Sequence, residues 1–251
     1  IILNLFILTF RPSKTAKAYK EIWMKKENMS PLRYYTLMQT KKLRERFDNN
    51  KIVVDYAMRY GNPSIKSIMT KLQQEGCENI IVLPLYPQYA APTTATVCDE
   101  VYRTLLKMRW QPSLQIIPHY ESEPLYIDAL VNSINKKILE LNWKPDLIIA
   151  SYHGIPKKYF EKGDPYHCYC QKTSRLMSEK YKQIPIKTTF QSRFGPQEWL
   201  QPYTDKTLED LPKEGKKNIL VICPGFSSDC VETLEEIAIQ GKESFIKSGG
   251  K

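Results

Sequence analysis

The sequence is poor in glycine, histidine and cysteine, and it has no long apolar run. Its 10 glycines among 251 residues form neither a Gly-x-Gly-x-x-Gly fingerprint nor a phosphate-binding loop, so nothing indicates a nucleotide cofactor. No stretch of about 18 apolar residues occurs, so none of these residues is expected to span a membrane. The six cysteines are irregularly spaced, which argues against a disulfide scaffold and makes a reducing cytoplasm the expected location.

Positive charge is in excess. The chain has 37 lysines and arginines against 27 aspartates and glutamates, which gives a net charge of +10. A basic balance favours nucleic acid or an anionic membrane surface as partners. However, no basic block is interleaved with aromatic residues, so we expect no nucleic acid. A lysine-rich solvated surface fits the pattern better, and an anionic small substrate is also compatible with it.

Short β-rich segments alternate with segments of helical length. Such alternation predicts βαβ units, and therefore an α/β fold with parallel sheets and helices on both faces. Proline at 112 and 118 flanks one strand before a long helix, so we divide the chain into halves 1–115 and 116–251. We expect strands at 51–58, 79–86, 114–120, 146–152, 184–190 and 218–224, and helices at 13–26, 35–47, 63–76, 94–109, 121–142, 168–183 and 229–247.

The ends of these strands are where a site is expected, because open α/β sheets bind ligands outside the carboxyl ends of their strands. His153, one of only three histidines, follows the apolar segment "DLIIASY". An imidazole there can accept a proton or bind ferrous iron. It can also be a histidine that is simply hydrogen-bonded at a strand end.

A second candidate lies after the last strand, where the sequence "DCVETLEEI" begins a helix. In an α-helix Asp229, Glu232 and Glu236 share one face. One interpretation is structural, since Asp229 caps the helix and Glu232 completes an approximate capping box. The other is an acidic face that leads to a metal or proton site, because a carboxylate and an imidazole are suitable ligands for ferrous iron.

Six segments, in the same order, resemble the signature segments of the ferrochelatase family over essentially the whole chain. They are "AMRYGNPSI", "VLPLYPQYAAPTTAT", "IPHYESEPLYIDAL", "SYHGIPKKYFEKGDPY", "TFQSRFGPQEWLQPYTDKTL" and "CPGFSSDCVETLEEIA". The resemblance looks closest to the gammaproteobacterial type. It implies two Rossmann-like halves with a porphyrin cleft between them. It also implies the last step of heme biosynthesis, the insertion of ferrous iron into protoporphyrin IX to make protoheme.

The same resemblance implies roles for individual residues. His153 corresponds to the iron-binding and catalytic histidine, and Glu232 to its paired glutamate. Asp229 and Glu236 then lie on a proton or metal path. A flat, apolar ring with two propionates needs aromatic walls and a few Arg, Ser or Tyr groups. Positions that correspond to the family's porphyrin contacts are Arg11, Tyr19, Ser30, Arg59 and Phe226.

Iron is the substrate in this interpretation, and no resident cofactor is expected. A [2Fe–2S] cluster needs four converging cysteines, whereas "HCYC" lacks a paired Cys-x-x-Cys, so ordinary buried thiols are the better interpretation. The resemblance implies a monomer and is compatible with peripheral membrane contact. Two alternatives stay open, namely a chelatase for another tetrapyrrole (such as coproporphyrin) or another metal, and a non-catalytic tetrapyrrole-binding protein.

The ends of the chain depart from the family pattern. The family has about one more strand and helix before the matched region, and it continues past the final "SGGK". We therefore expect a fragment whose N-terminal sheet lacks its first strand, unless "IILNL" replaces that strand.

Overall fold

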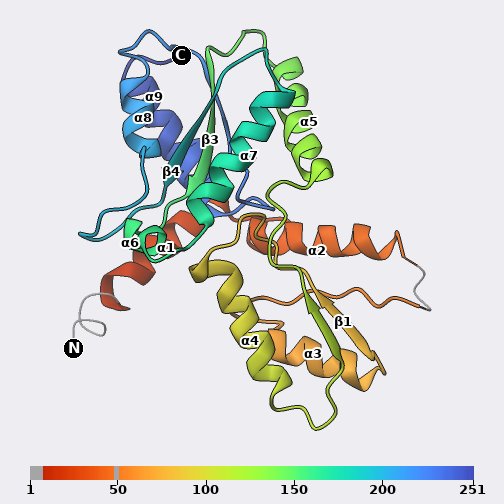
Figure 1. The fold of residues 1–251 in the computed structure, drawn as a ribbon. Helices are drawn as coiled ribbons and strands as arrows, with labels where there is room; N and C mark the ends of the chain where they lie inside the picture. Colours follow the sequence, from red (N-terminus) through yellow and green to blue (C-terminus); the bar gives the residue numbers. More distant parts are fainter. Residues whose placement is uncertain (1–7, 48–50) are drawn as a thin grey trace.

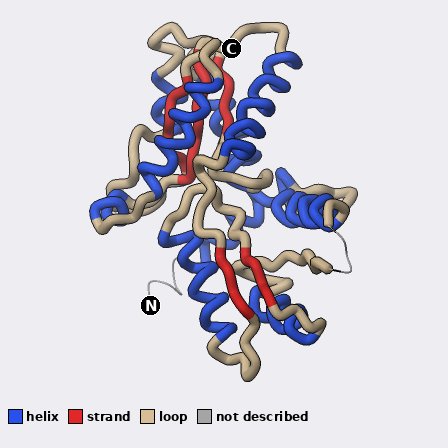
Figure 2. The backbone as a smooth tube through the Cα atoms, turned by 45° about the vertical axis from the view of Figure 1, so that its right-hand side comes forward, coloured by secondary structure: helices blue, strands red, loops and turns tan. Residues whose placement is uncertain are grey.

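The computed structural model describes residues 8–47 and 51–251, with side chains from residue 15 onward. Two parallel sheets lie in two groups of elements, with loop segments where the groups meet (Figures 1 and 2). The first group contains α2 (Pro31–Arg44), α3 (Ile65–Gln74), β1 (Asn79–Val82), the π-helix η2 (Ala91–Ala95), α4 (Thr96–Leu105) and β2 (Ser113–Ile116). The N-terminal helix α1 (Leu8–Ile22) contacts the π-helix η3 of the second group (Glu232–Gly241). The second contains α5 (Pro124–Glu140), β3 (Leu147–His153), α6 (Lys157–Glu161), α7 (Tyr166–Lys180), β4 (Ile186–Gln191), α8 (Thr204–Asp210), β5 (Ile219–Ile222), the π-helix η3 (Glu232–Gly241) and α9 (Lys242–Lys247).

The second group forms a three-stranded sheet in the order β4-β3-β5, with all pairs parallel. Its central strand β3 is buried from Leu147 to Tyr152, as expected for a strand covered on both faces. On one face α5 and α7 contribute Ile127, Ile134 and Met177 to the core. On the other face, α8 and α9 contribute Leu208 and Phe245. The predicted α/β class, with parallel sheets and helices on both faces, is confirmed.

In the first group, β1 pairs in parallel with β2. Helices α3 and α4 pack against this sheet through a cluster that includes Ile65, Met69, Val97 and Val101. Both strands are shorter than predicted, because prolines follow β1 at 84 and 87 and β2 at 118. A proline removes a backbone donor, so it ends the ladder of hydrogen bonds.

The strand predicted at 51–58 is wrong. In the part of the chain that the structure describes, this segment forms only an isolated bridge between Met58 and Ser64. An alternating pattern yields a strand only where a neighbouring strand supplies hydrogen bonds. Here the segment is held by ion pairs instead, since Asp55 binds the guanidinium of Arg44 at 3.0 Å and the ammonium of Lys71 at 2.7 Å.

The other predicted strands are β3, β4 and β5, with shifts of one to two residues at their ends. Each predicted helix overlaps an observed one, although the segment predicted at 229–247 is the π-helix η3 followed by α9. Two short helices, α6 and α8, were not predicted. The division at residue 115 stays a prediction.

Candidate active site

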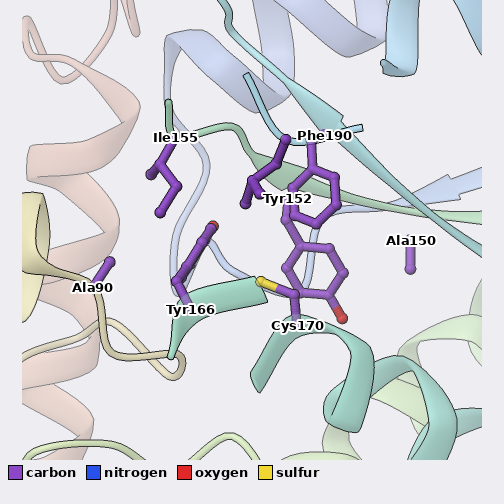
Figure 3. Packing of buried hydrophobic residues seen from close by; sticks show 8 residues of the cluster. Ala90, Ala150, Tyr152, Ile155, Tyr166, Cys170 and Phe190 are labelled. Atoms are coloured by element: carbon purple, nitrogen blue, oxygen red, sulfur yellow. The ribbon is translucent and has the colours of Figure 1, made fainter. Parts of the chain in front are cut away.

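His153 is the last residue of β3 and lies above a dense aromatic cluster. The cluster contains Tyr152, Tyr166, Cys170 and Phe190, all of them buried (Figure 3). The rings of Tyr152 and Phe190 lie 6.3 Å apart, and the Tyr166 hydroxyl donates to the His153 backbone oxygen at 2.9 Å. These contacts fix the backbone from which the imidazole projects.

The imidazole has one nitrogen engaged and one available. His153 Nδ1 lies 2.6 Å from the Gly154 oxygen, so Nδ1 carries the proton and donates it. Nε2 has no hydrogen-bond partner among the described residues, and its lone pair can accept a proton or bind a metal. The ring centroid of Phe226 lies 6.4 Å from that of His153. His153 is hydrogen-bonded at a strand end, as the structural interpretation expects, and its second ring nitrogen is available for the functional one, which stays a prediction.

Gly154 holds the turn after His153 close to β4. Its N–H donates to the Gln191 oxygen at 2.7 Å, and a Cβ added at this position would lie only 2.8 Å from that oxygen. Gly154→Ala is therefore expected to lower the free energy of unfolding by about 1–3 kcal/mol, as overpacking does elsewhere. Urea denaturation measures this change. An unchanged midpoint would show that β3 and β4 separate here without cost.

The segment after β5 does not form the capping box that the sequence predicts. No side chain caps η3. Asp229 Oδ1 instead accepts a hydrogen bond from Thr233 Oγ1 at 2.9 Å, and Thr233 Oγ1 accepts one from the Cys230 backbone N–H at 3.0 Å. The structural interpretation, in which Asp229 caps the helix and Glu232 completes the box, is therefore wrong, because the hydroxyl of Thr233 accepts the hydrogen bond from the Cys230 N–H instead.

Glu232 is the first residue of η3, and its charge acts on a thiol and a phenol whose pKa values are raised. The charge of Glu232 acts on the thiol of Cys230, two residues before it. Burial, and then the charge of Glu232, raise the pKa of this thiol, so it stays protonated at neutral pH. Burial and the charge of Glu232 also raise the pKa of Tyr19 on α1. The predicted residues Tyr19 and Glu232 are therefore brought together.

Glu236 faces a different neighbour. Its carboxylate accepts hydrogen bonds from the backbone N–H of Ser192 at 2.7 Å, from the Ser192 hydroxyl, and from Gln191 Nε2 at 3.3 Å. Gln191 Nε2 also donates to the Glu232 backbone oxygen at 2.7 Å. Gln191 and Ser192 were not singled out from the sequence. They stand at the carboxyl end of β4, which is the same signal that pointed to His153.

Glu236→Ala is expected to lower the free energy of unfolding by about 1–3 kcal/mol, because hydrogen bonds to charged groups are stronger than neutral ones. Glu236→Gln should lower it less, since one acceptor oxygen remains. Glu235→Ala is the matched control, because its carboxylate accepts only from Gln240 on the same helix. Equal losses for the two alanine variants, measured by urea denaturation, would contradict a specific tie to Ser192.

Tyr86, which packs against the cluster of α3 and α4, was also missed. Burial raises the pKa of its phenol, the charges of Tyr60 and Glu232 raise it further, and Arg59 lowers it. Arg59 and Glu232 therefore both act on Tyr86 although they are far apart in sequence. The Arg59 guanidinium stacks 4.5 Å above the Tyr60 ring. Its Nε is buried without a hydrogen-bond partner among the described residues, which leaves it able to bind an anion.

Comparison with known proteins shows the family of the chain. The ferrochelatase family model matches residues 1–251. The chain belongs to the ferrochelatase family. It is 59% identical over 248 residues to "Ferrochelatase" of Rhizobium meliloti (strain 1021), which covers 98% of this chain and 73% of that protein. It is 57% identical to the protein of the same name from Allorhizobium ampelinum, over 98% of this chain and 72% of the relative.

These relatives correct one expectation from the sequence. "Ferrochelatase" of Agrobacterium fabrum is 52% identical over 98% of this chain and 72% of that protein, and the sources named here are alphaproteobacterial. The sequence pattern places the chain closest to the gammaproteobacterial type, and the relatives do not support this. The ferrochelatase family itself, and its activity in heme synthesis, are supported.

For two of the residues predicted to contact the porphyrin, the structure shows either a different interaction or no side chain that is described. Ser30 is the N-cap of α2, where its hydroxyl accepts from the Arg33 N–H at 3.4 Å. Arg11 belongs to α1, but its side chain lies outside the described residues. Neither finding tests contact with a porphyrin.

A cavity of about 510 Å³ lies next to the candidate site. Phe226 and Asp229 line it together with residues of β5, η3 and α2, whereas His153 and Glu232 do not. The cavity therefore shares Phe226 and Asp229 with the candidate site and does not include its two central residues.

Two searches of residues 8–47 and 51–251 complete the description. No group of three or more His, Cys, Asp or Glu side chains is placed to hold a metal ion. No helix in these ranges combines the length and apolar character needed to cross a membrane.

Proposed function

We propose that His153 is the base, and Glu232 its acidic partner, in the insertion of ferrous iron into protoporphyrin IX by this chain. The observation that carries the proposal is the free Nε2 of an imidazole whose Nδ1 is engaged with Gly154, at the carboxyl end of the central strand. An imidazole with an available nitrogen is a common proton acceptor in enzymes.

The reaction exchanges one ferrous ion for two pyrrole N–H protons, so charge is conserved when both protons leave. His153 Nε2 accepts a pyrrole proton, and Glu232 accepts a proton or holds the incoming iron. Asp229 and Glu236 continue the acidic path away from the ring, and either His153 or Glu232 can be a transient iron ligand.

Binding of the macrocycle is assigned to residues around this pair. Phe226 offers an aromatic face near His153, and such faces suit a flat apolar ring. The orphaned Nε of Arg59 is available to a propionate. Tyr19, Ser30 and Arg11 complete the contacts, and we add Tyr86 because it is electrostatically coupled to both Arg59 and Glu232. A ring bound bent would expose its nitrogen lone pairs.

The finer points of the proposal are a monomeric chain in the cytoplasm, peripheral contact with the membrane, and iron as substrate without a resident cofactor or [2Fe–2S] cluster. Protoporphyrin IX is proposed over coproporphyrin because the wall so far identified is largely aromatic, whereas four propionates would need more cationic partners. Arg11 and Arg59 are the two arginines assigned to carboxylates.

Anaerobic insertion assays test the proposal. The chain is mixed with Fe²⁺ and either protoporphyrin IX or coproporphyrin, and the free-base absorption bands are followed as they give way to those of the metalloporphyrin. We expect turnover with protoporphyrin and little with coproporphyrin. Faster insertion into coproporphyrin would show that coproporphyrin is the substrate. Porphyrin binding without insertion would show that the chain is a non-catalytic tetrapyrrole-binding protein.

A further inference from the structure

The loop between β5 and η3, residues 223–231, is held by side chains from other parts of the chain. The Ser227 hydroxyl donates to the Leu85 backbone oxygen at 2.9 Å. Gln39 on α2 donates from Nε2 to the Ser227 backbone oxygen at 2.5 Å. This loop carries Phe226, whose ring faces His153. Its position therefore depends on residues that precede β2 in the sequence, outside the three-stranded sheet.

Gln88 is a buried polar side chain next to this loop, at 2% exposure. Its Nε2 donates to Thr173 Oγ1 on α7 at 2.9 Å and to the Tyr126 hydroxyl on α5 at 3.2 Å. The Tyr126 hydroxyl in turn donates to the Pro224 backbone oxygen at 2.6 Å. A chain of two hydrogen bonds thus joins Gln88 to the first residues of the loop.

The other end of the Gln88 amide points to the same loop. Its Oε1 is buried and has no hydrogen-bond partner in the described part of the chain. A Cβ added at Gly225 would lie 3.4 Å from this oxygen and 3.5 Å from Tyr152 Cδ1. Gly225 therefore lies directly against Gln88. A buried amide oxygen without a partner costs free energy, so a polar side chain here is not explained by packing alone.

We propose that Gln88 is a positioning residue, which holds residues 224–226 and through Phe226 sets the orientation of the macrocycle relative to His153. The inference rests on the proposed function of His153 and Phe226. Proton transfer depends on the placement of the reacting atoms to within about 1 Å. A looser loop should therefore slow insertion, whereas most of the apolar contact that binds the ring should remain.

Two variants and one control test this role. Gln88→Met keeps the length of the side chain and removes its hydrogen bonds, and Tyr126→Phe removes the hydroxyl that reaches Pro224. Tyr181→Phe is the matched control, because it removes the phenol oxygen of a buried tyrosine at the C-terminal end of α7, which packs in the cluster between α5, α7 and β3 and is assigned neither to the loop nor to the reaction. For each protein we would measure kcat for anaerobic metal insertion, Kd for protoporphyrin by fluorescence quenching, and the melting temperature.

Gln88→Met and Tyr126→Phe are expected to lower kcat about tenfold while Kd changes less than about threefold. The kcat of the double variant should be no lower than that of the less active single variant, because both substitutions act on one loop. Tyr181→Phe should keep kcat within about twofold of wild type, even if its melting temperature falls as much as that of the other two variants. If Gln88→Met fails to fold, the comparison of kcat between Tyr126→Phe and the control variant still tests whether the hydrogen bonds to the loop matter for insertion.

Three results would overturn the inference. The variants could keep the kcat of the control, their losses could be additive in the double variant, or Kd could weaken in proportion to kcat. If the wild-type chain inserts metal and His153→Ala does not, any of these results refutes only the role of Gln88. A wild-type chain without insertion activity refutes the proposed function and this inference together.

Discussion

His153→Ala is expected to lower kcat for iron insertion by about 10²–10⁴-fold, the usual contribution of a positioned acid or base. The affinity for protoporphyrin should change little, because the imidazole is only one small part of the surface that binds the ring. Initial rates of anaerobic insertion and a fluorescence titration with porphyrin measure the two quantities.

The matched control for this variant is His167→Ala. His167 lies on α7, where its ring stacks 5.7 Å from that of Phe190, and it is not assigned to the reaction. Its loss should leave kcat within about threefold of wild type. Near-full turnover by His153→Ala would refute the assignment of the base, and an equal loss in both variants would indicate a general effect of removing a histidine.

Glu232→Gln is expected to abolish insertion with almost no change in the free energy of unfolding. The substitution keeps the size of the side chain and removes its charge. Glu232 does not cap η3, and its contact with Gln191 is made by the backbone oxygen, so the fold does not depend on the carboxylate. Insertion rates and urea denaturation measure the two effects.

Glu235→Gln is the matched control, since it makes the same chemical change three residues further along η3. Its carboxylate accepts from Gln240 and is not assigned to the reaction, so insertion should continue at nearly the wild-type rate. The structural alternative for Glu232 predicts the opposite pattern, in which activity survives and stability falls by about 1 kcal/mol.

The sequence predicts the fold well where local pattern and burial agree. The continuous apolar run at β3 is covered on both faces, and the helices on each side have apolar faces that match it. The pattern fails at 51–58, because a strand also needs a partner, and alternation within one segment does not specify what lies beside it. Prolines after β1 and β2 ended those strands early, and this signal was present in the sequence.

The candidate site was predictable in part. His153 follows from its place at a strand end, and the observed engagement of Nδ1 with Gly154 leaves Nε2 available as required. The spacing of Asp229, Glu232 and Glu236 assumed an α-helix, whereas η3 is a π-helix with i→i+5 hydrogen bonds. Apolar and acidic residues alone do not distinguish these two helices over so short a segment.

The contacts that were missed are those made across long stretches of sequence. Glu236 binds Ser192, which is 44 positions away, and Tyr86 is coupled to Glu232 on η3. Such pairs arise from the register between β4 and β3 and from the packing of the two groups of elements. Neither is encoded in a local spacing, although the strand-end rule that selected His153 could have included Gln191 and Ser192.

Insertion in a single turnover tests most directly whether His153 performs the chemistry. Wild type and His153→Ala are each loaded with protoporphyrin, freed of excess porphyrin, and mixed anaerobically with Fe²⁺ while the absorption spectrum is recorded. We predict that wild type converts its bound porphyrin to protoheme, whereas the variant retains it unmetallated. Conversion at the same rate in both proteins would contradict the role proposed for His153.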